Sequence, residues 1–453
     1  MLNYIWLALI LLSVAIGGWN ERLKDVTDGA FDGAKTAVTI SFGLIGIMAL
    51  WLGVMRLAER AGLVQRIARA LRPIMRLLFP ELPADHPAIG SMVMNMAANM
   101  LGLGNAATPL GLRAMRDLET LNPRPGVATN SMCTFLALNT SSVQLIPTTA
   151  IALLAAAGST RPTAIVGTAL LATLCAATVA IISVKLLEKL PFFRLRDRAS
   201  AVAGGDDPGF ASAAGATTPA GVTAPGYSAS DAPLPTSWWA TPVLLVLGLF
   251  FAVLFTRMVL PNVFNLPLDP NAESQNVFVR SVNALSLLAI PFLLSFFPIY
   301  AFTRGLKVYE EFVEGAKEGF GVILKIIPFL VTMLVAINMF KGAGGIVLLT
   351  HLLTPVLAPL HFPPDLLPLA LMRPLSGSGT LALLADVVHR LGPDNIVSLM
   401  AATVYGSTET TFYVAAVYFG AVGVKQTRHA IPAGLLADLT GVIASVAICR
   451  AVL

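Results

Sequence analysis

Long runs of apolar residues, separated by short polar stretches, make up most of the chain. Each run approaches the twenty or so residues that a helix needs to cross the hydrocarbon of a bilayer. The pattern therefore predicts nine membrane-crossing helices, at 3–19, 36–55, 127–150, 163–187, 238–260, 282–302, 322–340, 397–422 and 430–451. Two further apolar stretches, 86–115 and 364–390, are interrupted by Gly and Pro, a pattern typical of re-entrant hairpins.

A segment of small and polar residues divides the chain. Residues 198–236 consist mainly of Ala, Gly, Ser, Thr, Pro and Asp, which cannot bury enough apolar surface to fold. This composition predicts a flexible linker between residues 1–197, a first repeat, and residues 237–453, an extra membrane helix followed by a second repeat.

The two halves share short motifs in the same order. Five weak matches recur at nearly constant spacing, which predicts that the halves are repeats of one unit. The matched pairs are Asp32–Lys35 with Glu314–Lys317, Ala61–Gly62 with Ala343–Gly344, Phe79–Pro80 with Phe362–Pro363, Gly102–Gly104 with Gly377–Gly379, and Asn139–Ser142 with Ser407–Thr410.

Basic residues predict the orientation of each half in the membrane. Residues 56–76 carry six arginines, so this segment is expected on the cytoplasmic side. The equivalent segment, 341–361, keeps one lysine and two histidines, which predicts that the second half is inverted. The chain is then a multi-pass protein of an inner membrane with its N-terminus and linker in the cytoplasm. Residues 63–78 fit an amphipathic helix in the interface or a solvated basic loop.

Composition excludes several classes of function. Only 12% of residues are charged, against about a quarter in soluble domains, while 56% are apolar and the mean hydropathy is +0.77. The net charge is +5, and most of the basic residues lie beside the apolar runs. This placement is typical of residues that orient a protein in a membrane, and it argues against nucleic-acid binding. The three cysteines have neither metal-site nor disulfide spacing, and no hydrolase, zinc-protease or phosphate-loop motif is present, so no enzyme activity is expected.

Four polar segments lie where apolar sequence is expected. Unpaired amides and hydroxyls in hydrocarbon are costly, so these side chains either staple and kink their own helices or face a solute. Gly102, Gly104 and Pro109 are expected to break the first segment. The candidate solute-binding residues are Asn95, Asn99, Asn105, Thr108, Asn139, Thr140, Ser141, Ser142, Gln144, Arg373, Ser376, Ser378, Ser407, Thr408, Glu409 and Thr410.

Arg373 and Glu409 are the ionisable groups at the centres of the last two polar segments. A charge at membrane depth faces a partner or a wet cavity. The two residues could pair only with each other, or Glu409 could bind a coupling proton, a cation or the solute while Arg373 meets an anionic group. Asp386 and His389, by contrast, are expected near the interface.

At Gly43–Gly53 and Asn95–Gly111 the first half resembles spore maturation protein A, and at Leu371–Gly379 and Gly406–Tyr413 the second resembles spore maturation protein B. The chain is thus similar to a fusion of the two, each with a nucleoside-recognition (Gate) domain. The resemblance implies an all-α fold whose core is like that of concentrative nucleoside transporters, with the substrate between re-entrant hairpins and broken helices. The Gate domain also occurs in the ferrous iron transporter B, but the GTPase motif of that protein is absent here.

These observations favour a secondary-transporter-like permease for a small polar solute, with a nucleoside-like compound as one candidate. Its site would lie near the midplane, between two inverted repeats in lipid, and alternating access would follow from rocking of the repeats. No cofactor is expected, a coupling proton or cation is left open, and a homo-oligomer is compatible with the sequence. The alternative is a non-transporting factor of membrane assembly or of spore and envelope maturation.

Overall fold

The computed structural model of the chain describes residues 2–83, 86–102, 104–193, 239–260, 276–345, 348 and 362–453, without the side chains of residues 2–5, 104–106 and 325–326. The predicted linker, 198–236, and most of the segment 341–361 lie outside the described residues. Over the described ranges the secondary structure is helical, with one isolated bridge between Val127 and Gln426. The helices are α1 (Leu2–Trp19), α2 (Leu23–Arg60), α3 (Leu63–Leu78), α4 (Pro87–Met100), α5 (Gly104–Glu119), α6 (Asn130–Thr140), α7 (Thr148–Ala156), α8 (Ile165–Leu187), α9 (Ala240–Val259), α11 (Val277–Thr303), α12 (Val308–Gly342), η2 (Pro364–Leu366), α14 (Leu367–Met372), α15 (Gly377–Leu391), α16 (Ile396–Ser407), α17 (Thr411–Gly420) and α18 (Ala430–Val452).

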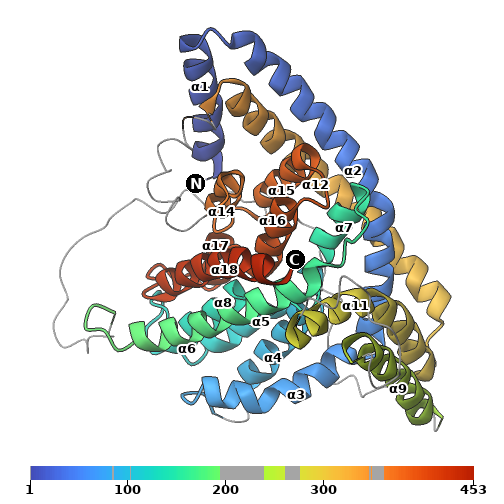
Figure 1. The fold of residues 1–453 in the computed structure, drawn as a ribbon. Coiled ribbons are helices and arrows are strands. Elements are labelled where there is room, and N and C mark those ends of the chain that lie inside the picture. Colours follow the sequence, from blue (N-terminus) through green and yellow to red (C-terminus); the bar gives the residue numbers. More distant parts are fainter. Residues whose placement is uncertain are drawn as a thin grey trace, which may run out of the picture.

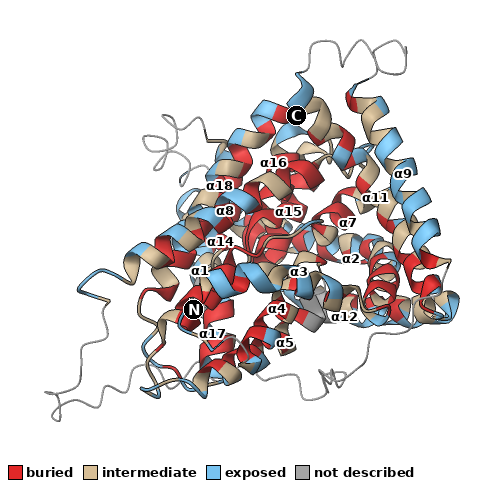
Figure 2. Ribbon diagram, turned by 90° about the horizontal axis from the view of Figure 1, so that it is seen from below, coloured by how far each residue is buried: buried red, intermediate tan, exposed pale blue. Residues whose placement is uncertain are grey.

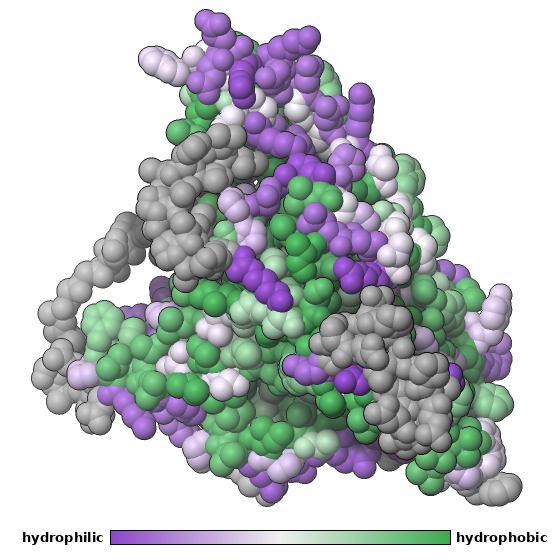
Figure 3. Space-filling model, viewed as in Figure 1, coloured by the Kyte–Doolittle hydropathy of each residue, from purple (hydrophilic) through white to green (hydrophobic). Residues whose placement is uncertain are grey.

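Among the described residues, six helices are long and apolar enough to cross a membrane: α2, α8, α9, α11, α12 and α18. They contain or match six of the predicted spans, and α1 is a shorter apolar helix over the predicted span 3–19. The chain is therefore a multi-pass membrane protein. Hydrophobic residues cover much of the body in Figure 3, while hydrophilic residues gather where α1 gives way to α2.

Two predicted spans are not continuous helices. Over 127–150, α6 ends at Thr140 and α7 begins only at Thr148 and continues to Ala156. Over 397–422, α16 ends at Ser407 and α17 begins at Thr411. Hydroxyl side chains that compete for backbone groups, and Pro147 in the first break, account for these interruptions. The expected break at Pro109 is wrong, since this proline lies within α5 and the chain turns at Gly102, where φ is +74°.

The longest helices, α2 and α12, lie side by side and antiparallel (Figure 1). At about 1.5 Å per residue they extend roughly 57 and 52 Å, more than the ~30 Å of hydrocarbon requires. Glycines permit their close approach: a Cβ at Gly33 would lie 2.6 Å from the Leu334 carbonyl oxygen, and one at Gly315 would lie 2.5 Å from that of Leu52. Where α2 ends, Arg56 pairs with Glu311 of α12 at 2.9 Å.

Buried residues concentrate around α8, α15, α16 and α18, whereas much of α9 at the edge of the molecule is exposed (Figure 2). Leu245, Val246 and Leu249 on α9 are each about two-thirds exposed, as expected for a helix that faces lipid. Residues 63–78 form the helix α3, which buries Val64 and Met75. The central helices α8 and α18 pack on each other, and they position the two interrupted helices beside them.

Polar connections join the helix ends in two separate groups. In one group, the Arg428 guanidinium donates to the carbonyl oxygens of Ala128 and Phe193. In the other, the Asp394 carboxylate accepts from the hydroxyls of Ser159 and Thr160. These bonds hold the pKa of Asp394 at about 2, below its usual range. The loops 120–129, 188–193 and 421–429 therefore lie together, as do the loops 157–164 and 392–395.

Candidate functional site

Each interrupted helix is tied to the turn of the helix pair in its own half. In the first half, the backbone N–H of Leu145 donates to the carbonyl of Met100, the last residue of α4, at 3.0 Å. In the second half, the N–H of Phe412 donates to the carbonyl of Pro374, between α14 and α15, also at 3.0 Å. The two halves thus place their polar segments by equivalent backbone hydrogen bonds.

A further backbone bond connects the two interruptions directly. The N–H of Glu409 donates to the carbonyl of Thr140 at 2.6 Å, so the free carbonyl at the end of α6 is satisfied by the break of the other half. Because both breaks and both turns meet here, four segments that are far apart in sequence converge on one region.

A cavity of about 130 Å³ lies at this convergence. Its walls are formed by residues of both turns and both interruptions, and by residues of the helices next to them. The residues that line it are Asn99, Gly102, Gln144, Pro147, Thr148, Thr149, Arg373, Gly377, Tyr405 and Glu409. Four of the candidate residues, Asn99, Gln144, Arg373 and Glu409, therefore line one cavity.

Arg373 and Glu409 line this cavity without forming an ion pair within the described part of the chain. Glu409 Oε1 accepts a hydrogen bond from Gln144 Nε2 at 3.1 Å. The Arg373 guanidinium lies over the ring of Tyr405, 5.1 Å from its centroid, and is 3.5 Å from the Thr410 hydroxyl. Its Nε is buried without a hydrogen-bond partner, so the cation retains donor capacity next to the cavity.

Other candidate amides form a hydrogen-bond network beside the cavity. Asn139 Oδ1 accepts from Asn99 Nδ2 at 3.1 Å and from the Tyr418 hydroxyl at 3.3 Å. Asn95 Nδ2 donates to the Ala107 carbonyl at 2.7 Å and contacts the same hydroxyl at 3.3 Å. Asn95 and Asn139 thus connect α4, α6 and α17. Holding helices together is one of the two roles that the sequence left open for these residues, the other being contact with a solute.

The remaining candidate residues are mostly buried around the breaks. Ser376 caps α15 by accepting from the N–H of Gly379, and its hydroxyl lies 3.3 Å from that of Ser378. Thr108 lies on α5, half-buried, while the side chain of Asn105 is outside the described residues. The buried hydroxyl residues at the two interruptions are Thr140, Ser141, Ser142, Ser407, Thr408 and Thr410.

Two features were not identified from the sequence. Thr148 and Thr149 line the cavity because α7 starts there, which the assumption of one continuous helix concealed. Asp438 is buried in α18, where its Oδ2 accepts from the Thr411 hydroxyl at 2.6 Å. A single acidic residue inside the apolar run 430–451 was the available signal.

Asp386, expected near the interface, is buried and pairs with Arg390 at 2.7 Å.

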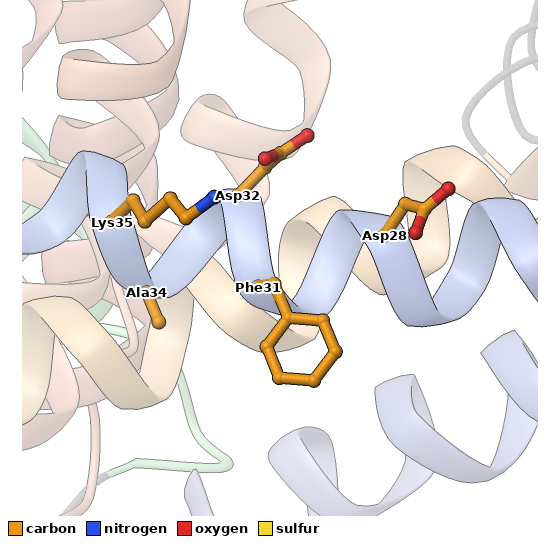
Figure 4. Close-up of a pocket in the computed structure, with 5 residues that line it drawn as sticks. All are labelled: Asp28, Phe31, Asp32, Ala34 and Lys35. Carbon is orange, nitrogen blue, oxygen red and sulfur yellow. The ribbon is translucent and has the colours of Figure 1, made fainter.

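A larger hollow, of about 540 Å³, lies against α2 and is lined by Asp28, Phe31, Asp32, Ala34 and Lys35. Figure 4 shows that these side chains come from one helix and point in different directions. They do not converge on a common point, so this hollow offers no organised binding site.

Comparison with known proteins gives concordant matches to the two halves. The family model described as Gate, nucleoside recognition, matches residues 41–186 and 323–425, more than half of the chain. Spore maturation protein A of Bacillus subtilis (strain 168) is 48% identical over 182 residues, covering 40% of this chain and 93% of that protein. Spore maturation protein B of the same organism is 44% identical over 167 residues, covering 37% of this chain and 94% of that protein. The N-terminal half is similar to the first protein and the C-terminal half to the second, so the resemblance to a fusion is confirmed.

Proposed function

Because this chain belongs to the Gate, nucleoside-recognition family, we propose that it is a secondary-transporter-like permease for a small polar solute. The observation that carries the proposal is the cavity between the two halves, where Arg373 and Glu409 face one space without neutralising each other. A cation with a free donor and a carboxylate with one amide partner can bind a solute that carries both acceptors and donors, as a nucleoside does. The proposal includes no catalytic step.

We further propose that the halves are inverted repeats, each with a re-entrant hairpin (α4–α5 and α14–α15) and a broken helix. The reciprocal glycine contacts of α2 and α12 and the equivalent bonds of Leu145 and Phe412 support this arrangement. The two groups of connections support a topology with residues 120–129, 188–193 and 421–429 in the cytoplasm and residues 157–164 and 392–395 outside it, and the arginines of residues 56–76 favour the cytoplasm for that segment. The membrane is then the bacterial inner membrane, with the N-terminus and linker cytoplasmic.

The cavity is smaller than the 300–1,000 Å³ of typical small-molecule sites. A nucleoside therefore requires the turns and interruptions of the two halves to separate. Rocking of one repeat against the other, with α8 and α18 as the central contact, would open the cavity to one side at a time.

A second candidate function is a membrane assembly or maturation factor, consistent with the names of the relatives. The hydrogen bonds that Asn95 and Asn139 share with Tyr418 favour it, because these three side chains connect helices and do not line the cavity. In this reading Glu409 serves only to join the two breaks through Gln144, and Arg373 only to join the turn between α14 and α15 to the second break through Thr410.

The deciding experiment is the thermal stability of the purified protein with a panel of nucleosides, nucleobases, small acids and monovalent cations. A compound that binds only the folded state at a hundredfold excess over its Kd stabilises it by about 2.7 kcal/mol. We expect such a compound to raise the melting temperature of the wild type and of Glu311→Gln, a matched control on α12, but not that of Glu409→Gln. If no compound shifts the wild type and Glu409→Gln only melts earlier, the assembly function is favoured.

A further inference from the structure

The carboxyl of Asp438 lies in the interior of the membrane helix α18. It is the ninth residue of this 23-residue helix, about 12 Å along an axis of roughly 34 Å, and its exposure is 2%. A buried charge requires a partner, yet no ion pair to Asp438 occurs among the described residues. An ionised carboxylate here would be an uncompensated charge in an apolar span.

The two carboxyl oxygens have different surroundings. Oδ2 accepts from the Thr411 hydroxyl at 2.6 Å, whereas Oδ1 is buried without a hydrogen-bond partner. The hydroxyl of Thr408 faces the same carboxyl, and its oxygen is also buried without a hydrogen bond of ordinary geometry. With one proton on Oδ1, the carboxyl could donate to this oxygen.

The face of α18 that carries Asp438 is shaped to receive the interrupted helix. Gly434, Asp438 and Gly441 follow the i, i+4, i+7 spacing of one helix face. A Cβ at Gly434 would lie 2.9 Å from the Thr411 hydroxyl oxygen, and one at Gly441 would lie 2.9 Å from that of Ser407. The glycines therefore let both ends of the break between α16 and α17 reach the carboxyl.

The helix α8 of the first half also carries a polar residue that contacts the interruption of its own half. Thr173, the ninth residue of the 23-residue helix α8, donates to the carbonyls of Ser141 at 3.1 Å and Ser142 at 2.8 Å. Both positions thus contact the interruption of their own half. The hydroxyl of Thr173 does not titrate, whereas the carboxyl of Asp438 does, so of these two positions only the one in the second half can take up a proton.

Among the described residues, no cation forms an ion pair with the carboxyl, and α18 itself carries Cys449 and, in its last turn, Arg450. The charges whose fields reach it are those of Arg373 and Glu409, which are opposite in sign. The five helices packed on α18 contribute these titratable groups: Cys133 on α6, Cys175 and Lys185 on α8, Arg280 and Tyr300 on α11, Tyr405 on α16, and Tyr413 and Tyr418 on α17. Lys185 lies in the last turn of α8 and pairs with Glu188.

We propose that Asp438 is the proton-binding site of this protein, and, resting on the proposed permease function, that its proton is the coupling ion. In the described conformation the carboxyl is protonated and bridges Thr411 and Thr408. When the break between α16 and α17 moves off α18, a movement within the second repeat that accompanies the rocking, water reaches the carboxyl, the O–H bond breaks, and the proton passes to water on that side. One proton from the other side restores the carboxyl, and no other species is consumed.

Infrared difference spectroscopy of the reconstituted protein tests the proton site without any solute. We expect a protonated-carboxyl band at neutral pH that is lost in Asp438→Asn and retained in Glu409→Gln and in Asp386→Asn, whose carboxylate pairs with Arg390. Thr411→Val, which removes the hydrogen bond to Oδ2, should move the band to higher wavenumber. Absence of the band in the wild type, or its persistence in Asp438→Asn, would overturn the assignment.

Uridine and adenosine flux into proteoliposomes tests the coupling. With the outside acidified, one proton per solute predicts about tenfold accumulation for each pH unit, because one unit corresponds to ~1.4 kcal/mol. Asp438→Asn should retain solute exchange and lose the response to the gradient, while accumulation by this variant equal to that of the wild type would refute coupling through Asp438. If the wild type moves neither nucleoside, the permease function fails for these solutes, and the infrared result still decides whether Asp438 binds a proton.

Discussion

Gly33 of α2 and Gly315 of α12 make the same contact in opposite directions across one helix pair. Gly33 faces the backbone of Leu334, and Gly315 faces that of Leu52. Gly315 follows Gly33 by 282 residues, and Leu334 follows Leu52 by the same number. Exchange of the two halves therefore maps one contact onto the other, as the proposed inverted repeats require.

This reciprocity predicts that Gly33→Ala and Gly315→Ala destabilise the protein to a similar extent. Each added methyl would meet a backbone carbonyl that cannot move independently of its helix, so we expect a cost of about 1–3 kcal/mol. The measurement is thermal unfolding in one detergent.

The matched controls are Gly46→Ala on α2 and Gly321→Ala on α12, where an added Cβ meets no atom within 4 Å. These substitutions should be neutral or slightly stabilising, because alanine favours helix by about 0.5–1 kcal/mol over glycine. Equal melting temperatures for the contact and control variants would contradict the close packing of the two helices.

The stapling network predicts that Tyr418→Phe lowers stability more than Tyr413→Phe. Tyr418 is 5% exposed and its hydroxyl contacts Asn95 and Asn139, whereas Tyr413 is 57% exposed. Loss of a buried hydroxyl that joins two amides should cost about 1–3 kcal/mol. Thermal unfolding without ligand measures the difference, and indistinguishable variants would argue against the network.

Acidification should destabilise the protein through His429, which precedes α18. Burial, with the nearby charges of Arg428 and Lys185, lowers the pKa of His429 to about 4 from its usual 6.5. Since the unfolded chain binds this proton at a higher pH than the folded one, the contribution of His429 to stability falls as the pH drops from about 6.5 to 4.

The readout is the melting temperature of the wild type and of His429→Gln over this pH range. The variant should lose part of the dependence on pH, whereas His389→Gln, the control, should follow the wild type. A His429→Gln profile parallel to that of the wild type would show that the histidine does not titrate in this way.

The proposed topology predicts which loops react with an impermeant thiol reagent in intact cells. In a Cys175→Ser background, which removes the exposed native cysteine, cysteines at Thr160 and Pro393 should be labelled from outside. Cysteines at Arg124 and Gln426 should be labelled only after the membrane is permeabilised. Labelling of all four positions from the same side would contradict the inverted arrangement.

The sequence by itself determined the membrane class, six of the long apolar helices and the repeated order of motifs. These features are local, because hydropathy over twenty residues and a few glycines and prolines specify them without long-range contacts. It also drew attention to Arg373 and Glu409 as ionisable residues within polar segments, although the same kind of signal at Asp438 was missed. The linker boundaries and the sidedness of each loop stay predictions.

Tertiary structure alone decided how the polar residues divide between stapling and the cavity. Asn95 and Asn139 resemble Asn99 and Gln144 in sequence, but the position of Tyr418, more than 270 residues away, gives the first pair their partners. The absence of an ion pair between Arg373 and Glu409 likewise depends on how the two turns and the two interruptions meet. The burial of Asp438 against Thr411 depends on the glycine face of α18. Such contacts join segments distant in the chain, so no local pattern of residues encodes them.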